Sequence, residues 1–165
     1  MKSIKMRKAQ AWGFDLIMAA IVFLAGIVIF YIYSLNYPTE GKENLDALSY
    51  EGNLIADNLL SSGFPKDWTK TNVVAIGIAD EGKINETKLS RLNDLANDIG
   101  GYDKTRALFN TKFQYYFNLT EIMTIDGSNV NYIGQLQSTP KNLIKITRFT
   151  AYKNKPVTLN VYVWD

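Results

Sequence analysis

Cysteine and histidine are both absent from this chain of 165 residues. Without cysteine, the chain has neither a disulfide framework nor a thiolate site for a metal. Without histidine, it also lacks the commonest general base and the commonest zinc ligand. These absences count against most hydrolases and most transition-metal proteins, although they leave carboxylate and serine–lysine chemistry open. We therefore expect a protein that is not an enzyme and that holds no cofactor or metal.

Excess positive charge is also missing beyond the first eight residues. The formal net charge is +2, from 18 basic and 16 acidic residues, but Lys2, Lys5, Arg7 and Lys8 supply four of the positive charges. Setting these four and Asp15 aside leaves 14 basic and 15 acidic residues, so the rest of the chain is nearly neutral. A basic surface for nucleic acid is missing, and we expect no nucleic-acid partner.

A long run without any charged side chain extends from Leu16 to Thr39. Its first part, Leu16–Leu35, is almost wholly aliphatic or aromatic. A helix of that length rises about 30 Å, which is the hydrocarbon thickness of a bilayer. The run is longer than the apolar region of a secretory signal, which has roughly 7–15 residues. It is also apolar on every face, unlike most buried core helices. We interpret residues 10–37 as a transmembrane helix.

The charges on the two sides of this helix predict its orientation. The basic residues 1–9 precede it, whereas mixed charge begins in the short break at residues 38–42. The positive-inside rule then makes residues 1–9 a cytoplasmic leader and residues 43–165 the extracytoplasmic domain of a cell-membrane protein. Two sequons, at Asn85 and Asn118, would lie outside and are candidates for glycosylation.

Asp15 is an acid at the start of the apolar run. A carboxylate costs about 2.5–3.5 kcal/mol at the centre of a membrane helix and less near its end. One interpretation is an interfacial acid that reaches water and is stabilised by the positive end of the helix dipole. The other is an acid that pairs with a positive partner when such helices pack together.

The junction Arg7-Lys8-Ala9-Gln10, followed by Asp15 and a long apolar helix, resembles the class III signal of archaeal type IV pilin-like proteins. In that family a membrane-embedded aspartic peptidase, the prepilin peptidase, cuts on the cytoplasmic side just before the hydrophobic helix. The resemblance implies cleavage between Ala9 and Gln10 and pairing of the new α-amine with Asp15 of the same or a neighbouring subunit. The helices would then bundle as the core of a surface filament, with other pilin-like subunits as partners.

The N-terminal segment departs from the family pattern in two ways. The family acid is usually a glutamate at the fifth mature position, whereas Asp15 would be the sixth. Trp12 and Phe14 stand where small or aliphatic residues are usual. The rest of the chain is similar to small pilin-like domains only in its plan, with helix first and sheet last.

The domain after the break is predicted to begin with a helix from Glu43. Gly63 and Pro65 provide a good stop signal for it. The run Val73–Ala79 is short and apolar, and it is predicted to be a buried strand. The apolar or small residues of the helix recur every three or four positions: Leu45, Leu48, Gly52, Ile55, Ala56 and Leu59.

Two further helices are predicted in the middle of the domain. The first spans Lys88–Ile99, with Thr87 as its N-cap. Asp103 is predicted to cap the second, which ends near Asn110. The apolar face of the first consists of Leu89, Leu92, Ala96 and Ile99.

Strand patterns dominate the second half of the domain. Lys112–Thr120 is rich in aromatic residues, and Val130–Leu136 is a weaker strand. The clearest hairpin joins Leu143–Tyr152 to Val157–Trp164 through a short turn. In the last strand apolar residues alternate with polar or aromatic ones, as in an antiparallel sheet covered on one side. A change of phase near Arg148 predicts a bulge. The fold class is therefore α+β, with an antiparallel C-terminal sheet.

Several patterns that carry chemistry in other proteins have simpler interpretations here. Asp80–Asn85 places oxygen atoms around a glycine but lacks the acid spacing of an EF-hand loop, which disfavours calcium. Asp94 and Asp98 are most simply a solvated face of the predicted helix. Six aromatic residues would suit a stacking surface for glycans or for a partner, although such residues more often fill a core: Tyr115, Tyr116, Tyr132, Tyr152, Tyr162 and Trp164.

Two functions remain for the whole chain. The first is a pilin, minor pilin or pseudopilin subunit, anchored by its helix until it is processed and then assembled through that helix. The alternative is an uncleaved single-pass membrane protein whose external domain binds a ligand or a partner. The alternative predicts that residues 1–9 are retained and that no filament forms.

Overall fold

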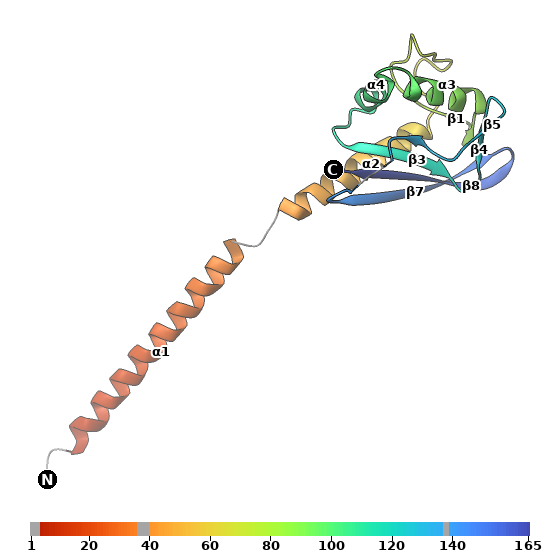
Figure 1. Ribbon diagram of the computed structural model, residues 1–165. Coiled ribbons are helices and arrows are strands. Elements are labelled where there is room, and N and C mark those ends of the chain that lie inside the picture. The colour runs from red at the N-terminus through yellow and green to blue at the C-terminus, as the bar shows by residue number, and fades with distance from the viewer. Residues whose placement is uncertain (1–3, 36–39, 137–138) are drawn as a thin grey trace. The chain divides into compact units, whose positions relative to one another are not determined.

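The computed structural model describes residues 4–35, 40–136 and 139–165, and the chain forms two compact units (Figure 1). The N-terminal unit, Met1–Glu40, contains helix α1 (Ile4–Leu35). The C-terminal unit, Gly41–Asp165, contains almost all of the other elements. Side chains are described for residues 12–35, 43–136 and 139–165.

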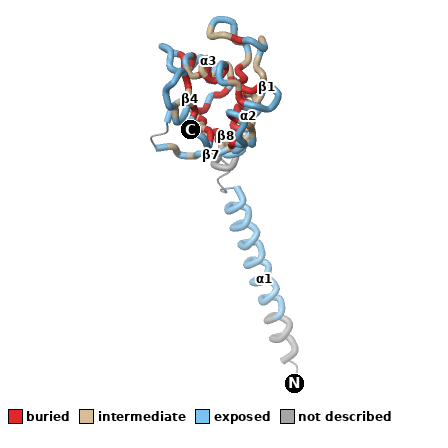
Figure 2. The backbone as a smooth tube through the Cα atoms, turned by 90° about the vertical axis from the view of Figure 1, so that its right-hand side faces the viewer, coloured by how far each residue is buried: buried red, intermediate tan, exposed pale blue. Residues whose placement is uncertain are grey.

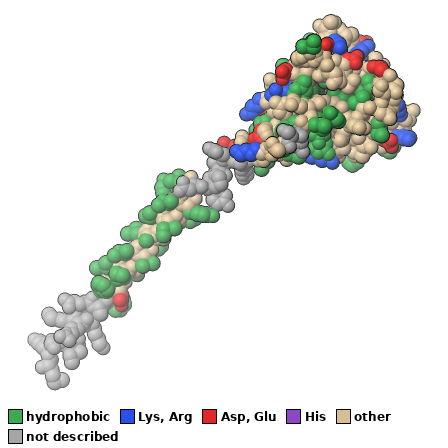
Figure 3. Space-filling view, viewed as in Figure 1, with side chains coloured by type: hydrophobic (Ala, Val, Ile, Leu, Met, Phe, Trp, Pro, Cys, Tyr) green, Lys and Arg blue, Asp and Glu red, His purple; other side chains and the backbone are tan. Residues whose placement is uncertain are grey.

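Helix α1 is apolar around its whole circumference. Every side chain from Trp12 to Leu35 is exposed within the N-terminal unit (Figure 2). Hydrophobic side chains run along the visible length of this part of the helix (Figure 3). These 24 residues are long and apolar enough to cross a membrane, since they rise about 36 Å. The predicted apolar helix is therefore present.

The C-terminal unit has an α+β fold built on a six-stranded sheet, in the order β1-β2-β7-β8-β3-β6, with a separate β4–β5 pair. The sheet is antiparallel except where β2 pairs with β7 in parallel, so the predicted antiparallel sheet is present with one parallel addition. The helices are α2 (Glu40–Leu59), α3 (Glu86–Asn97) and α4 (Gly101–Leu108). The strands are β1 (Ala79–Asp80), β2 (Lys83–Ile84), β3 (Gln114–Leu119), β4 (Met123–Ile125), β5 (Ser128–Val130), β6 (Ile133–Gly134), β7 (Leu143–Tyr152) and β8 (Lys155–Trp164).

Helix α2 packs on the inner face of the sheet through its predicted apolar stripe. Gly52 makes the close approach, because a Cβ there would lie 3.0 Å from Cγ1 of Ile146 and 3.3 Å from Cγ2 of Val163. Leu45 departs from the prediction and is exposed. The buried members of the stripe are Leu48, Gly52, Ile55, Ala56 and Leu59.

The β7–β8 hairpin is the most regular part of the sheet. Its register is continuous from Leu143 opposite Trp164 to Tyr152 opposite Lys155, so the predicted bulge is wrong. The sequence changes phase because Arg148 points to the inner face, where its guanidinium donates to Asp57 and Asn53 of α2 at 3.2 and 2.6 Å. A charged side chain therefore occupies an inward position, and its neighbour Phe149 is left 87% exposed.

The run from Val73 to Ala79 is buried only from Ile76 to Ala79, whereas Val74 is exposed, and it is not a regular strand. The N–H groups of Ile78 and Ala79 donate to the carbonyls of Leu59 and Ser61, at the end of α2. Only Ala79 belongs to a named strand, the two-residue β1. The prediction failed because this segment satisfies its backbone on a helix end instead of on a neighbouring strand.

The predicted starts of the two middle helices are also wrong. Asn85, and not Thr87, caps α3: its side-chain oxygen accepts from the backbone N–H groups of Thr87 and Lys88. Gly100, in the left-handed conformation with φ 69°, precedes α4 in place of Asp103. Because α3 ends at Asn97, Ile99 lies beyond the helix and is fully exposed.

The hydrophobic core lies between the helices and the inner face of the sheet, where buried residues gather in the centre of the unit (Figure 2). The Tyr115 ring stacks with Tyr102 and meets Phe109 edge to face, which fixes α4 on β3. Its hydroxyl donates to Thr105 at 2.6 Å. Trp68, in the loop after α2, is completely buried, whereas Phe64 of the same loop is exposed.

Candidate functional site

Helix α1 carries the residues that the sequence singles out for processing and assembly. Asp15 is exposed on α1, and with Trp12 and Leu16 it borders a shallow depression. Ala9 and Gln10 lie within α1, but their side chains are outside the described residues. The cleavage site and the role of Asp15 therefore stay predictions.

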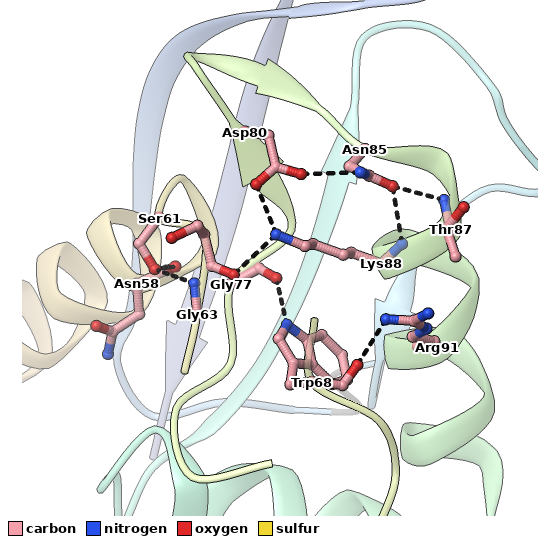
Figure 4. A network of polar contacts seen from close by, with 11 residues as sticks. Asn58, Ser61, Gly63, Trp68, Gly77, Asp80, Asn85, Thr87, Lys88 and Arg91 are labelled. Carbon is pink, nitrogen blue, oxygen red and sulfur yellow. Dashed lines mark hydrogen bonds and ion pairs between the residues drawn. The ribbon is translucent and has the colours of Figure 1, made fainter. Parts of the chain in front are cut away.

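The C-terminal unit contains a buried polar network centred on Lys88 (Figure 4). The Lys88 side chain is only 3% exposed, although a lysine is rarely buried without a partner. Its ammonium donates to the Asp80 carboxylate at 2.6 Å and to the carbonyl of Ser62 at 2.9 Å. The Asn85 amide donates to the second oxygen of the same carboxylate at 2.8 Å. The network thus ties the start of α3 to β1 and to the end of α2.

Hydrogen bonds to Asp80 dominate the electrostatics of this network. The Lys88 ammonium, through its hydrogen bond, holds the pKa of the Asp80 carboxyl below its usual value. Partial burial opposes this effect, and the Asn85 hydrogen bond reinforces it. The carboxylate is therefore the stable form of Asp80.

A second part of the network holds the loop between α2 and β1. The indole N–H of Trp68 donates to the carbonyl of Gly77 at 2.8 Å. Arg91 of α3 donates to the carbonyl of Trp68 at 2.7 Å. The indole, the guanidinium and the Lys88 ammonium thus bind groups of the same chain, so the network has the chemistry of a structural clamp.

The sequence contained a signal for this clamp. Lys88 precedes Leu92 and Leu95 at helical spacings of four and seven, and both leucines are buried. A lysine in register with a buried stripe must pair with an acid or a carbonyl. The partners Asp80 and Ser62 could not be named in advance, because the fold brings them together.

Two of the acids in the patterns weighed as possible cation sites bind other groups of the chain. Asp98 pairs with Lys70 at 3.3 Å, and Asp80 is engaged by Lys88 and Asn85. Among the described residues, no group of three or more acidic, histidine or cysteine side chains is placed to hold a metal ion.

The two sequon asparagines have different surroundings. Asn85 caps α3 with its oxygen, and its amide nitrogen donates to Asp80. Asn118 lies partly exposed on β3, where its oxygen accepts from the amide of Asn160 at 3.1 Å. Glycosylation of either residue stays a prediction.

The six aromatic residues considered for a stacking surface differ in burial. Tyr115, Tyr152 and Trp164 are buried, whereas Tyr132 is exposed. The Trp164 ring also meets Tyr116 edge to face at 5.6 Å. On the outer face of the sheet, Tyr116 and Tyr162 stack with ring centroids 4.5 Å apart and planes 8° apart. Burial and the nearby Tyr162 raise the pKa of Tyr116.

Comparison of the chain with protein-family models, with curated proteins and with solved structures finds no significant match.

Proposed function

We propose that this protein is a membrane-anchored, type IV pilin-like subunit that assembles through helix α1. The observation that carries the proposal is a helix apolar on every face over Trp12–Leu35, in which Asp15 is the only charged residue. A surface of this kind is stable only in lipid or against other apolar helices.

In this proposal the basic residues 1–9 stay in the cytoplasm and the C-terminal unit lies outside the membrane. The prepilin peptidase removes residues 1–9, and Gln10 becomes the N-terminus. Its α-amine pairs with Asp15 of the same or a neighbouring subunit, which neutralises the carboxylate in a poorly solvated place. Helix bundling then covers the apolar surface that α1 exposes in the single chain.

The α+β order of the C-terminal unit is compatible with a pilin-like plan. Helix α2 packs on the inner face of a sheet whose longest strands come last in the chain. In this proposal the C-terminal unit is the exposed part of the subunit, and α1 makes the contacts of assembly.

Asp15→Ala is expected to leave membrane insertion intact while abolishing incorporation into filaments. Alanine removes the partner of the new α-amine without adding any cost in lipid. The measurement is the ratio of subunit in the sheared surface fraction to subunit in the membrane fraction. Asp15→Glu is the matched control, and it should retain incorporation because it keeps the charge. Normal incorporation of Asp15→Ala would leave Asp15 as a simple interfacial acid.

A further inference from the structure

We propose that a cleft on the C-terminal unit binds a neutral carbohydrate. The cleft lies where α3 approaches β6 and the end of the β4–β5 pair. It has a volume of about 400 Å³, a size typical of small-ligand sites. Its polar lining comes from Asn93 and Asn97 on α3 and from Asn129, Asn131 and Tyr132 around β5 and β6.

The lining of this cleft is rich in amides and free of charge. Four asparagines contribute to it, and none of the residues that line it is acidic or basic. Each carboxamide offers an oxygen acceptor and two N–H donors. Sugar hydroxyl groups both donate and accept, so they match carboxamides. A phosphate or a metal ion would need the charged groups that this lining lacks.

Two of the four amides in the cleft are hydrogen-bonded to each other, and the other two are available to a ligand. Asn97 donates to the side-chain oxygen of Asn93 at 3.0 Å and to its backbone carbonyl at 2.9 Å, which fixes both side chains on α3. Within the part of the chain that the structure describes, the side chains of Asn129 and Asn131 make no hydrogen bond. Their exposed amides can therefore bind a ligand without breaking a protein contact.

Tyr132 supplies an aromatic wall beside these amides. Tyr132 is 40% exposed, and its ring meets Tyr116 edge to face at 6.2 Å. Tyr116 is itself stacked on Tyr162, so the Tyr132 ring rests against a packed aromatic pair. The C–H face of a pyranose ring stacks on such a surface while its hydroxyls reach the neighbouring amides. A fixed ring also lowers the entropy lost on binding.

The direct test is saturation-transfer NMR of the full chain in lipid nanodiscs, which avoid detergents with sugar head groups. The neutral probes are maltohexaose, mannohexaose, galactohexaose and chitohexaose, and hexagalacturonate is the acidic comparator. We expect at least one neutral probe to bind, and hexagalacturonate to bind more weakly. Tyr132→Ala should weaken binding roughly tenfold, the effect of losing one good aromatic contact.

Two further variants distinguish a loss of binding at the cleft from a loss of binding caused by unfolding. Asn131→Leu keeps the side-chain size but removes the amide, and it should also weaken binding roughly tenfold. Tyr50→Ala, at an exposed tyrosine of α2 outside the cleft, should leave binding unchanged. Unchanged thermal unfolding of each variant checks the fold.

Three results would overturn the proposal. These are no transfer to any of the four neutral probes, preference for hexagalacturonate, and full binding by both Tyr132→Ala and Asn131→Leu. The outcome does not depend on cleavage of residues 1–9, so it is independent of the proposed role of α1.

Discussion

Asp80→Ala is expected to destabilise the C-terminal unit by about 3 kcal/mol, at the lower end of the cost of breaking a buried ion pair. The substitution leaves the ammonium of Lys88 buried at 3% exposure, with the Ser62 carbonyl as its remaining partner. It also removes the acceptor of the Asn85 amide, the residue that caps α3. The lower end applies because the Asp80 side chain is 29% exposed, so water reaches the pair.

Lys88→Met removes the other partner of the ion pair, and its loss of stability can be compared with that of Asp80→Ala. Methionine keeps most of the buried hydrocarbon, and the Asp80 carboxylate left behind is hydrated, so this variant should lose less stability than Asp80→Ala. Adding Lys88→Met to Asp80→Ala should recover roughly 1–2 kcal/mol, because the buried charge is then gone. Urea unfolding of the full chain in micelles, followed by near-ultraviolet circular dichroism, measures the free energy of unfolding of the two single variants and the double variant.

A surface ion pair supplies the control for these variants. Asp103 pairs with Arg106 at 3.3 Å, but its side chain is 79% exposed. Asp103→Ala should therefore change stability by less than about 1 kcal/mol. Equal effects of Asp80→Ala and Asp103→Ala would contradict the structural role given to Lys88.

The same pair gives the stability a defined dependence on pH. Folding lowers the pKa of Asp80, so the contribution of its carboxylate is fully present above the unfolded value of about 3.9. It is lost as the pH falls from that value through the lower native pKa. Asp80→Ala should lack this part of the acid dependence, as should Lys88→Met.

Replacing both Leu24 and Ile27 by arginine is expected to release the protein from the membrane. The two positions lie near the middle of Trp12–Leu35. Each arginine costs about 2.5–3.5 kcal/mol at the centre of a membrane helix, so the pair costs roughly 5–7 kcal/mol before the lost apolar side chains are counted. Alkaline carbonate extraction of membranes, followed by immunoblotting, measures the retained fraction.

The matched control replaces the same two residues by alanine, which shortens the side chains without adding charge. This variant should remain in the carbonate-resistant pellet with the unaltered chain. Extraction of the unaltered chain by carbonate would contradict a membrane-spanning α1, as would retention of the arginine variant.

Elements with a strong local pattern were predictable from the sequence. Helix α1 is an unbroken apolar run, whereas the stripe of α2 and the β7–β8 hairpin each repeat a simple period over several turns or residue pairs. The N-cap of α3 was harder, because Asn85 and Thr87 are both good caps and stand two residues apart. The fold selects Asn85, whose amide also binds Asp80.

The clamp and the cleft depend on contacts that the sequence does not encode locally. Lys88 stands in register with a buried leucine stripe, but its partner Ser62 lies 26 residues away and could not be named from the sequence. The cleft combines Asn93 and Asn97 of α3 with residues of β5 and β6 more than thirty positions later. Only the packing of α3 against the edge strand brings these amides together.

The central claim, a processed helix that serves in assembly, is tested most directly at the N-terminus of the native protein. Intact-mass measurement and N-terminal sequencing should be applied to protein isolated from its own membrane and surface fractions. We expect a chain that begins at Gln10 in the surface fraction, with residues 1–9 removed. A chain that begins at Met1 in both fractions would contradict processing and leave an uncleaved single-pass protein.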